Sequence, residues 1–299
     1  MTRSLPVADA ASRVLRKRLA AVGRAVALVS ANNTRAEAVH RLRVSTRRAS
    51  AAITAFRPLI PRRQRRWFKK SLRRMRDAAG EARDLDVLAA RCREASAARS
   101  SEAGATARRR LKELLAKRRP ETRRGLEAVI ADLRRHDWKT KTAAVVAAVA
   151  SAPTAETIAA FAGRRSRRLV GRFLARLDHR LRDERDIHRL RIETKKLRYV
   201  LEAFADGMQP AASAACDRTL RRLQGRLGEF TDHAAAAERL RLWLRHEEVA
   251  RARQTLLAAR RQESASANRA KRDCIRWWTA SRREAVARHV RRALGGKTA

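Results

Sequence analysis

The sequence predicts an all-α protein, and three observations support that prediction. The 299 residues include 61 Ala but only 11 Gly and 6 Pro, and aromatic residues make up 4% of the chain. Sheet-rich folds are enriched in β-branched and aromatic residues and in turn-forming Gly and Pro. Hydrophobic residues amount to 44%, which is enough for a packed core, and they recur at helical spacing.

Helix boundaries are expected where this spacing is interrupted. Breaks or helix starts are indicated by the Asn-containing segment 31–34 and by Pro58, Pro61, Pro120, Pro153 and Pro210. The predicted helices are 7–30, 35–57, 62–80, 84–117, 121–136, 154–183, 185–206, 211–228, 232–262 and 267–293. Residues 137–153 have no clear amphipathic stripe, so we expect them to bridge two halves, with Ala and Val side chains available for packing.

One segment of the sequence is repeated. Residues 39–56 read VHRLRVSTRRASAAITAF, and residues 187–204 read IHRLRIETKKLRYVLEAF, an offset of 148 at every position. The same offset relates Gly80 to Gly228 and Asp84 to Asp232. This pattern predicts a tandem duplication in which residues 1–136 and 154–299 form two pseudo-symmetric helical sub-bundles within a single domain spanning 1–299.

The charge predicts an anionic partner. The formal net charge is +43, and 62 of the 73 basic residues are Arg, whose planar donor fork suits phosphate oxygens. Such self-repulsion is relieved by a polyanion.

Cys92, Cys216 and Cys274 form neither a CxxC pair nor a disulfide framework. With no apolar signal core or membrane-length segment, these features are typical of a cytoplasmic protein that does not act at a membrane.

The repeated unit places a cationic stripe on one helix in each copy. We name these stripes by their residues, the first ridge being His40, Arg43, Arg47 and Arg48, and the second ridge His188, Arg191, Lys195 and Lys196. The opposite face of each helix is apolar. Like charges at this spacing destabilise an isolated helix. Two matching ridges therefore indicate an anion bound between them rather than a merely solvated surface.

The pair of [VI]HxxR[VI]xx[RK][RK] motifs, together with GEARDLDVL and its echo GEFTDHAAA, resembles the two halves of the CHAD domain, the conserved histidine α-helical domain. The resemblance covers nearly the whole chain. It implies two helical sub-bundles around a strongly basic cavity that binds inorganic polyphosphate, with the two ridges as the family's basic motif positions. It also implies association with polyphosphate granules, which some members show.

Four further basic residues and two acidic residues are candidates for the same site. Arg18 shares the apolar face of the first helix, and Arg172 borders the apolar stripe of Leu169, so each is expected at a cavity or extending to the surface. Arg73 and Arg221 lie beside the apolar edge of their helices. Asp84 and Asp232 are expected to cap new helices, and each is a candidate for orienting a ridge residue from behind.

Two other function classes are weighed against polyphosphate binding. Nucleic-acid binding needs only positive charge, but no zinc-finger, helix-turn-helix or RNP pattern occurs. An enzyme is not expected, because Walker, HExxH, GxSxG and ExExK patterns are absent. No cofactor is expected, and a metal site is disfavoured because three cations surround each ridge histidine.

Overall fold

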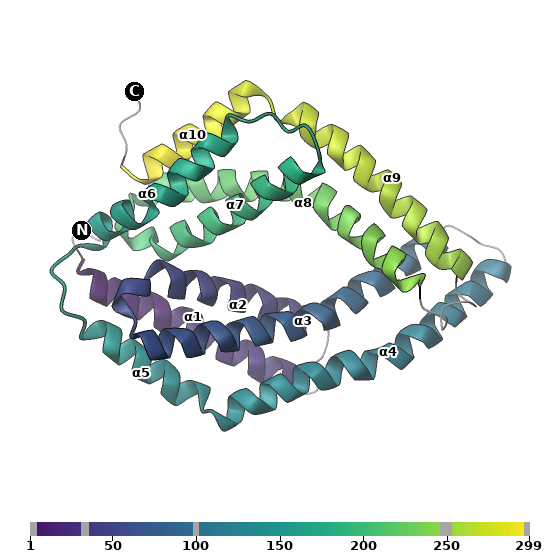
Figure 1. Cartoon of the computed structure of the whole chain (residues 1–299), viewed down its shortest axis with the longest axis horizontal. Helices are drawn as coiled ribbons and strands as arrows, with labels where there is room; N and C mark the ends of the chain where they lie inside the picture. Colours follow the sequence, from purple (N-terminus) through teal and green to yellow (C-terminus); the bar gives the residue numbers. More distant parts are fainter. Residues whose placement is uncertain (1–4, 31–35, 98–101, 246–252, 296–299) are drawn as a thin grey trace.

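The computed structural model describes residues 5–30, 36–97, 102–245 and 253–295 (Figure 1). Within these ranges the regular secondary structure is helical, apart from an isolated β-bridge between Pro6 and Thr157. The all-α prediction is therefore confirmed. The elements are α1 Val7–Ser30, α2 Ala36–Ala55, η2 Arg57–Leu59, α3 Arg62–Ala97, α4 Glu102–Arg135, α5 Trp138–Ala150, α6 Ile158–Leu177, α7 Glu184–Ala203, η3 Ala205–Gly207, α8 Pro210–Trp243, α9 Arg253–Trp277 and α10 Ala280–Ala293.

The helices form two groups that follow the order of the chain. Helices α1 to α5 lie on one side of the molecule and α6 to α10 on the other (Figure 1). The groups contact each other where α2 packs on α7 and where α3 and α4 pack on α9. The two helices that carry the predicted ridges, α2 and α7, are thus neighbours in space.

The two copies of the repeated unit form elements with matching bounds. Adding 148 to the bounds of α2 gives those of α7, and the same addition converts η2 into η3 and the start of α3 into the start of α8. Phe56 and Phe204, which end the two motif copies, contact each other edge to face with centroids 5.4 Å apart. The duplication itself remains an interpretation of the sequence.

The main core runs through both groups of helices. Phe56 and Phe204 are fully buried in it, and Phe161 of α6 packs against both rings. A small separate cluster joins α3, α4, α8 and α9, and it includes Leu85, Leu115, Leu240 and Leu256. Because the apolar contacts lie on the faces opposite the ridges, burial of the core holds the cationic faces outward from it.

The expected bridge is an ordered helix. Asp137 caps α5 by accepting a hydrogen bond from Thr140 N at 3.1 Å, and Trp138 Nε1 donates to the Leu19 carbonyl of α1 at 3.0 Å. Trp138 also packs on Trp67 and Phe68 of α3. The Ala- and Val-rich segment 137–153 therefore packs on the first group of helices.

The predicted breaks near residues 81–83, 118–120 and 229–231 are wrong. Helix α3 continues through Gly80 to Ala97, α4 continues through Pro120, and α8 continues through Gly228 to Trp243. An interior Gly costs only about 1 kcal/mol relative to Ala, which packing of a long helix readily offsets. Asp84 and Asp232 consequently lie inside helices and cap neither. The predicted helices 232–262 and 267–293 also have the wrong bounds, because α9 runs from Arg253 to Trp277 and α10 starts at Ala280.

Candidate phosphate-binding site

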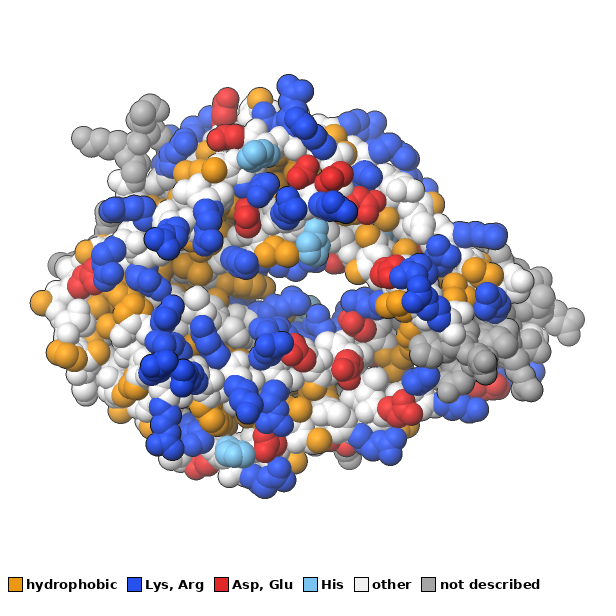
Figure 2. Space-filling model, viewed as in Figure 1, with side chains coloured by type: hydrophobic (Ala, Val, Ile, Leu, Met, Phe, Trp, Pro, Cys, Tyr) orange, Lys and Arg blue, Asp and Glu red, His pale blue; other side chains and the backbone are white. Residues whose placement is uncertain are grey.

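The two ridges face one cavity of about 1030 Å³ between α2, α3, α7 and α8. Figure 2 shows an opening between the two groups of helices, with Lys and Arg side chains along it. Six of the eight ridge residues line this central cavity: His40, Arg43, Arg47, His188, Arg191 and Lys195. Residues far apart in the sequence are thus brought together from both copies.

A glycine lies beside the matching arginine in each half. A Cβ on Gly80 would lie 3.3 Å from Arg43 Nη1, and one on Gly228 would lie 4.0 Å from Arg191 Nε. Arg43 Nη1 also approaches the Ala79 carbonyl at 3.5 Å. The glycine in α3 therefore leaves the space that the Arg43 guanidinium occupies. The equivalent space in α8 is less tight.

Cations exceed acids in the central cavity. Its lining contains eight Arg or Lys residues and four Asp or Glu residues. Burial lowers the pKa of the Arg43 guanidinium, and the charge of Arg47 lowers it further. Burial also lowers the pKa of Arg191, an effect partly opposed by Asp232. These positive charges are held close together, where an anion would stabilise them.

Lys195 responds most strongly to this environment. Burial, followed by the charges of Arg191 and Arg47, lowers the pKa of its ammonium group to about 8. Arg47 belongs to α2 and Lys195 to α7, so the repulsion acts across the cavity. A phosphate group between the ridges would oppose that repulsion.

The two candidate carboxylates act differently from each other. Arg191 Nη2 donates to Asp232 Oδ1 at 2.7 Å, so Asp232 does hold a ridge arginine. Asp84 Oδ1 instead lies 2.9 Å from Nη2 of Arg239, which projects from α8 of the other half. Asp84 thereby links α3 to α8 at the wall of the central cavity.

Arg48 and Lys196 do not line the central cavity. Arg48 Nε lies 3.0 Å from Glu202 Oε1, and Arg18 Nη2 donates to the same oxygen at 2.8 Å. Lys196 is exposed on α7. These two ridge positions lie a quarter-turn from the rest of their stripes, which directs them to other neighbours. Arg18 was expected either at a cavity or extending to the surface, and it lines a smaller cavity beside Arg48.

The structure does not bring Arg73, Arg221 or Arg172 to the central cavity. Arg73 is exposed and pairs with Asp77 one turn later, at 3.5 Å. Arg221 donates to Asp217 at 2.6 Å, one turn earlier. Arg172 is exposed on α6. The nearby aspartates in the sequence were a signal that Arg73 and Arg221 have local partners.

Other basic residues of the central cavity were missed by the sequence reasoning. They are Arg83, Arg185, Arg189 and Arg239. Arg185 precedes His188 by three residues and so shares its helix face, which is a signal available in the sequence. Arg239 comes seven residues after Asp232 and shares its face of α8, but its position opposite α3 depends on long-range packing.

Among the described residues, no group of three His, Cys, Asp or Glu side chains is arranged to hold a metal ion. Cys216 and Cys274 are free and buried, and burial raises the pKa of their thiols to about 12 and about 11. The side chain of Cys92 lies outside the described residues. No described helix combines the length and apolarity needed to span a bilayer.

Comparisons with known proteins identify a family and a fold. The model of the CHAD domain matches residues 13–241. The crystal structure of the CHAD domain from the plant Ricinus communis is similar, with 22% identity over 100% of this chain and 95% of that chain and a TM-score of 0.71. PptA from Streptomyces chartreusis shares 18% identity over 91% of this chain and 99% of that chain, with a TM-score of 0.58. No curated protein matches the sequence.

Proposed function

The chain belongs to the CHAD domain family, and we propose that it binds inorganic polyphosphate in the central cavity. The observation that carries the proposal is the convergence of six ridge residues from two helices, α2 and α7, on one cavity of about 1030 Å³. The family is linked in general to polyphosphate binding.

The arrangement of charge supports a chain of phosphates over a single anion. The cationic groups come from both sides of the cavity, and Arg47 on one side acts on Lys195 on the other. Arg191 Nε is buried and, among the described residues, has no hydrogen-bond partner. Several linked phosphates can satisfy donors on both ridges at once, whereas a free phosphate forfeits the linked contacts.

We propose binding without catalysis. The Thr231 hydroxyl in the lining donates to the Leu227 carbonyl of its own helix, and so is engaged rather than activated. Asp84 and Asp232 are each paired with an arginine. Neither carboxylate is therefore poised as a general base, which needs an accessible proton acceptor. Granule association follows from this binding wherever polyphosphate accumulates.

Competition between ligands tests the proposal. Long-chain polyphosphate should bind much more tightly than duplex DNA at about 200 mM salt, where nonspecific phosphate contacts are greatly weakened. We expect a thin single chain to enter the cavity, whereas a duplex about 20 Å across would reach only the outer surface. Fluorescence anisotropy with a labelled duplex, displaced by unlabelled polyphosphate, measures the difference. Equal affinities would assign the protein to nonspecific nucleic-acid binding instead.

A further inference from the structure

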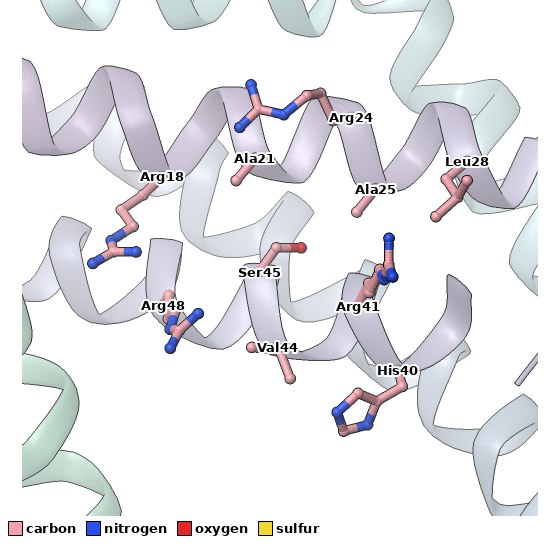
Figure 3. Close-up of a pocket in the computed structure, with 10 residues that line it drawn as sticks. All are labelled: Arg18, Ala21, Arg24, Ala25, Leu28, His40, Arg41, Val44, Ser45 and Arg48. Carbon is pink, nitrogen blue, oxygen red and sulfur yellow. The ribbon is translucent and has the colours of Figure 1, made fainter. Parts of the chain in front are cut away.

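A second cavity lies beside the first ridge, in a groove between α1 and α2. We call it the α1–α2 groove, and its volume is about 530 Å³ (Figure 3). Four arginines line it: Arg18, Arg24, Arg41 and Arg48. His40 lines both this groove and the central cavity. The two cavities therefore share one side chain as their common border.

Small side chains keep this groove open. Ala21, Ala25 and Ser45 line it. In the second half, buried Val170, Phe173 and Leu177 of α6 stand 148 positions after buried Val22, Ala25 and Val29 of α1, which aligns the two helices in this region. The same offset places Leu169, Phe173 and Glu193 where the first half has Ala21, Ala25 and Ser45. Each of these residues is larger than its counterpart, and Phe173 lies in the main core with Leu169 packed against it.

An ion pair crosses the equivalent position in the second half. Arg176 Nε lies 3.6 Å from Glu193 Oε2, joining α6 to α7. In the first half the corresponding residues are Leu28 and Ser45, which make no such pair. Polar side chains can therefore join this pair of helices in the second half. Helix packing does not require the groove between α1 and α2 to stay open.

The groove carries more positive charge than its neighbours neutralise. Glu202 pairs with both Arg18 and Arg48, and Glu37 pairs with Arg41 at 2.9 Å. Arg24 has no ion-pair partner within the described part of the chain. The Arg48 Nε atom is buried and forms no hydrogen bond to a described residue, although Glu202 lies near it. Two carboxylates for four arginines leave donors for an anion.

We propose that the α1–α2 groove is a second phosphate-binding site, which takes a continuation of the polyphosphate chain that leaves the central cavity past His40. This inference rests on the proposed function and adds chain-length selectivity to it. A short oligophosphate fills only the central cavity. A long chain gains the contacts of Arg24 and its neighbours as well, because the second segment binds at high effective concentration.

Closing the groove without changing the net charge tests this inference. The double substitution Leu28→Arg and Ser45→Glu introduces the Arg176–Glu193 pair of the second half at the equivalent place. Affinity for long-chain polyphosphate should fall by about tenfold, while affinity for tripolyphosphate should stay unchanged. Isothermal titration calorimetry with both ligands measures the two effects on one preparation.

A single substitution gives an independent readout if the double variant folds poorly. Arg24 is exposed, so Arg24→Ala should preserve the fold, weaken long-chain binding severalfold and reduce the slope of log affinity against log salt by about 0.7. Arg16→Ala is the matched control, since it removes one exposed charge from the same helix outside the groove. It should leave the long-chain affinity nearly unchanged.

The outcomes separate the groove from the central cavity. Unchanged long-chain binding in both variants, or equal effects of Arg24→Ala and Arg16→Ala, would overturn the groove as a binding site while the proposed function stands. Equal losses for tripolyphosphate and the long chain in the double variant would likewise count against it, because the central cavity would then be altered. Failure of the unmodified protein to bind either ligand would overturn the proposed function itself.

Discussion

Arg43 on α2 and Arg191 on α7 occupy matching positions, yet their carboxylate neighbours differ. Arg191 is held by Asp232 of its own half at 2.7 Å, whereas Asp84, the counterpart of Asp232, pairs with Arg239 across the cavity. Arg43 donates a long hydrogen bond of 3.5 Å to the Ala79 carbonyl. The two halves therefore keep the same cations at the cavity while the pairing behind them varies, which marks the ridge charge as the shared feature.

The halves differ more at the two ridge positions that do not line the central cavity. Arg48 joins Arg18 at Glu202 beside an open groove, whereas the corresponding Lys196 is exposed. The comparison teaches that one face of the motif helix serves a site common to both halves. The adjacent face differs between them, and in the first half it borders a second cavity.

Removing charge from either ridge should have the largest effect on binding. We expect Arg43→Ala with Arg47→Ala to weaken long-chain polyphosphate binding about as much as Arg191→Ala with Lys195→Ala, by at least about a hundredfold. Each lost charge-assisted hydrogen bond is worth about 1.5–3 kcal/mol. The salt slope should fall by about 1.4, from about 0.7 per phosphate contact. Titration at several salt concentrations measures both quantities.

The control is a double variant with the same loss of charge on an outer surface. Arg62 and Arg66 are exposed on α3 and do not line the central cavity, so Arg62→Ala with Arg66→Ala should change affinity far less. If the double substitution in one ridge leaves the affinity unchanged, the ligand does not bind between the ridges. The two halves would then not contribute equally to binding, although the description of the fold would still hold.

The sequence predicted the parts of this site that depend on local periodicity. The bounds of α1 were predicted at both ends, and six of the eight ridge residues of α2 and α7 line one cavity. The sequence placed Arg48 with the rest of the first ridge, whereas it lines the α1–α2 groove. A helical wheel gives the direction of a side chain but not the helix that the side chain meets. Gly80 and Gly228 led to predicted helix ends, although both lie inside helices. The sequence alone does not show that a glycine is needed beside Arg43, whose guanidinium occupies the space next to Gly80.

Titration of Lys195 should make binding depend on pH in the range above neutrality. With a pKa of about 8 in the free protein, Lys195 loses its charge between about pH 7 and pH 9. A bound phosphate favours the charged form, so affinity should fall by up to about tenfold over this interval. Calorimetry in buffers of different ionisation enthalpy should detect proton uptake on binding near pH 8.

The same group gives a stability effect of opposite direction in the ligand-free protein. The folded pKa of Lys195 lies below its ordinary value of 10.5, so between about 8 and 10.5 the unfolded chain binds more protons. The contribution of Lys195 to the free energy of unfolding should therefore rise with pH in that window. Lys195→Met should flatten both profiles. A profile of binding unchanged by this substitution would assign the titration to another group.

The smallest expected effects come from the two glycines, and they sharpen the comparison of the halves. Gly228→Ala should raise the free energy of unfolding by about 0.5–1 kcal/mol, because Ala is the better helix former and the new Cβ meets its nearest neighbours at 3.9 and 4.0 Å. Gly80→Ala gains the same helix propensity, but its Cβ would lie 3.3 Å from Arg43 Nη1 and displace that guanidinium. Polyphosphate binding should therefore weaken severalfold in Gly80→Ala and much less in Gly228→Ala. Thermal unfolding and titration of both variants measure the two effects, and an equal loss of affinity would show that the spacing beside Arg43 does not distinguish the first half.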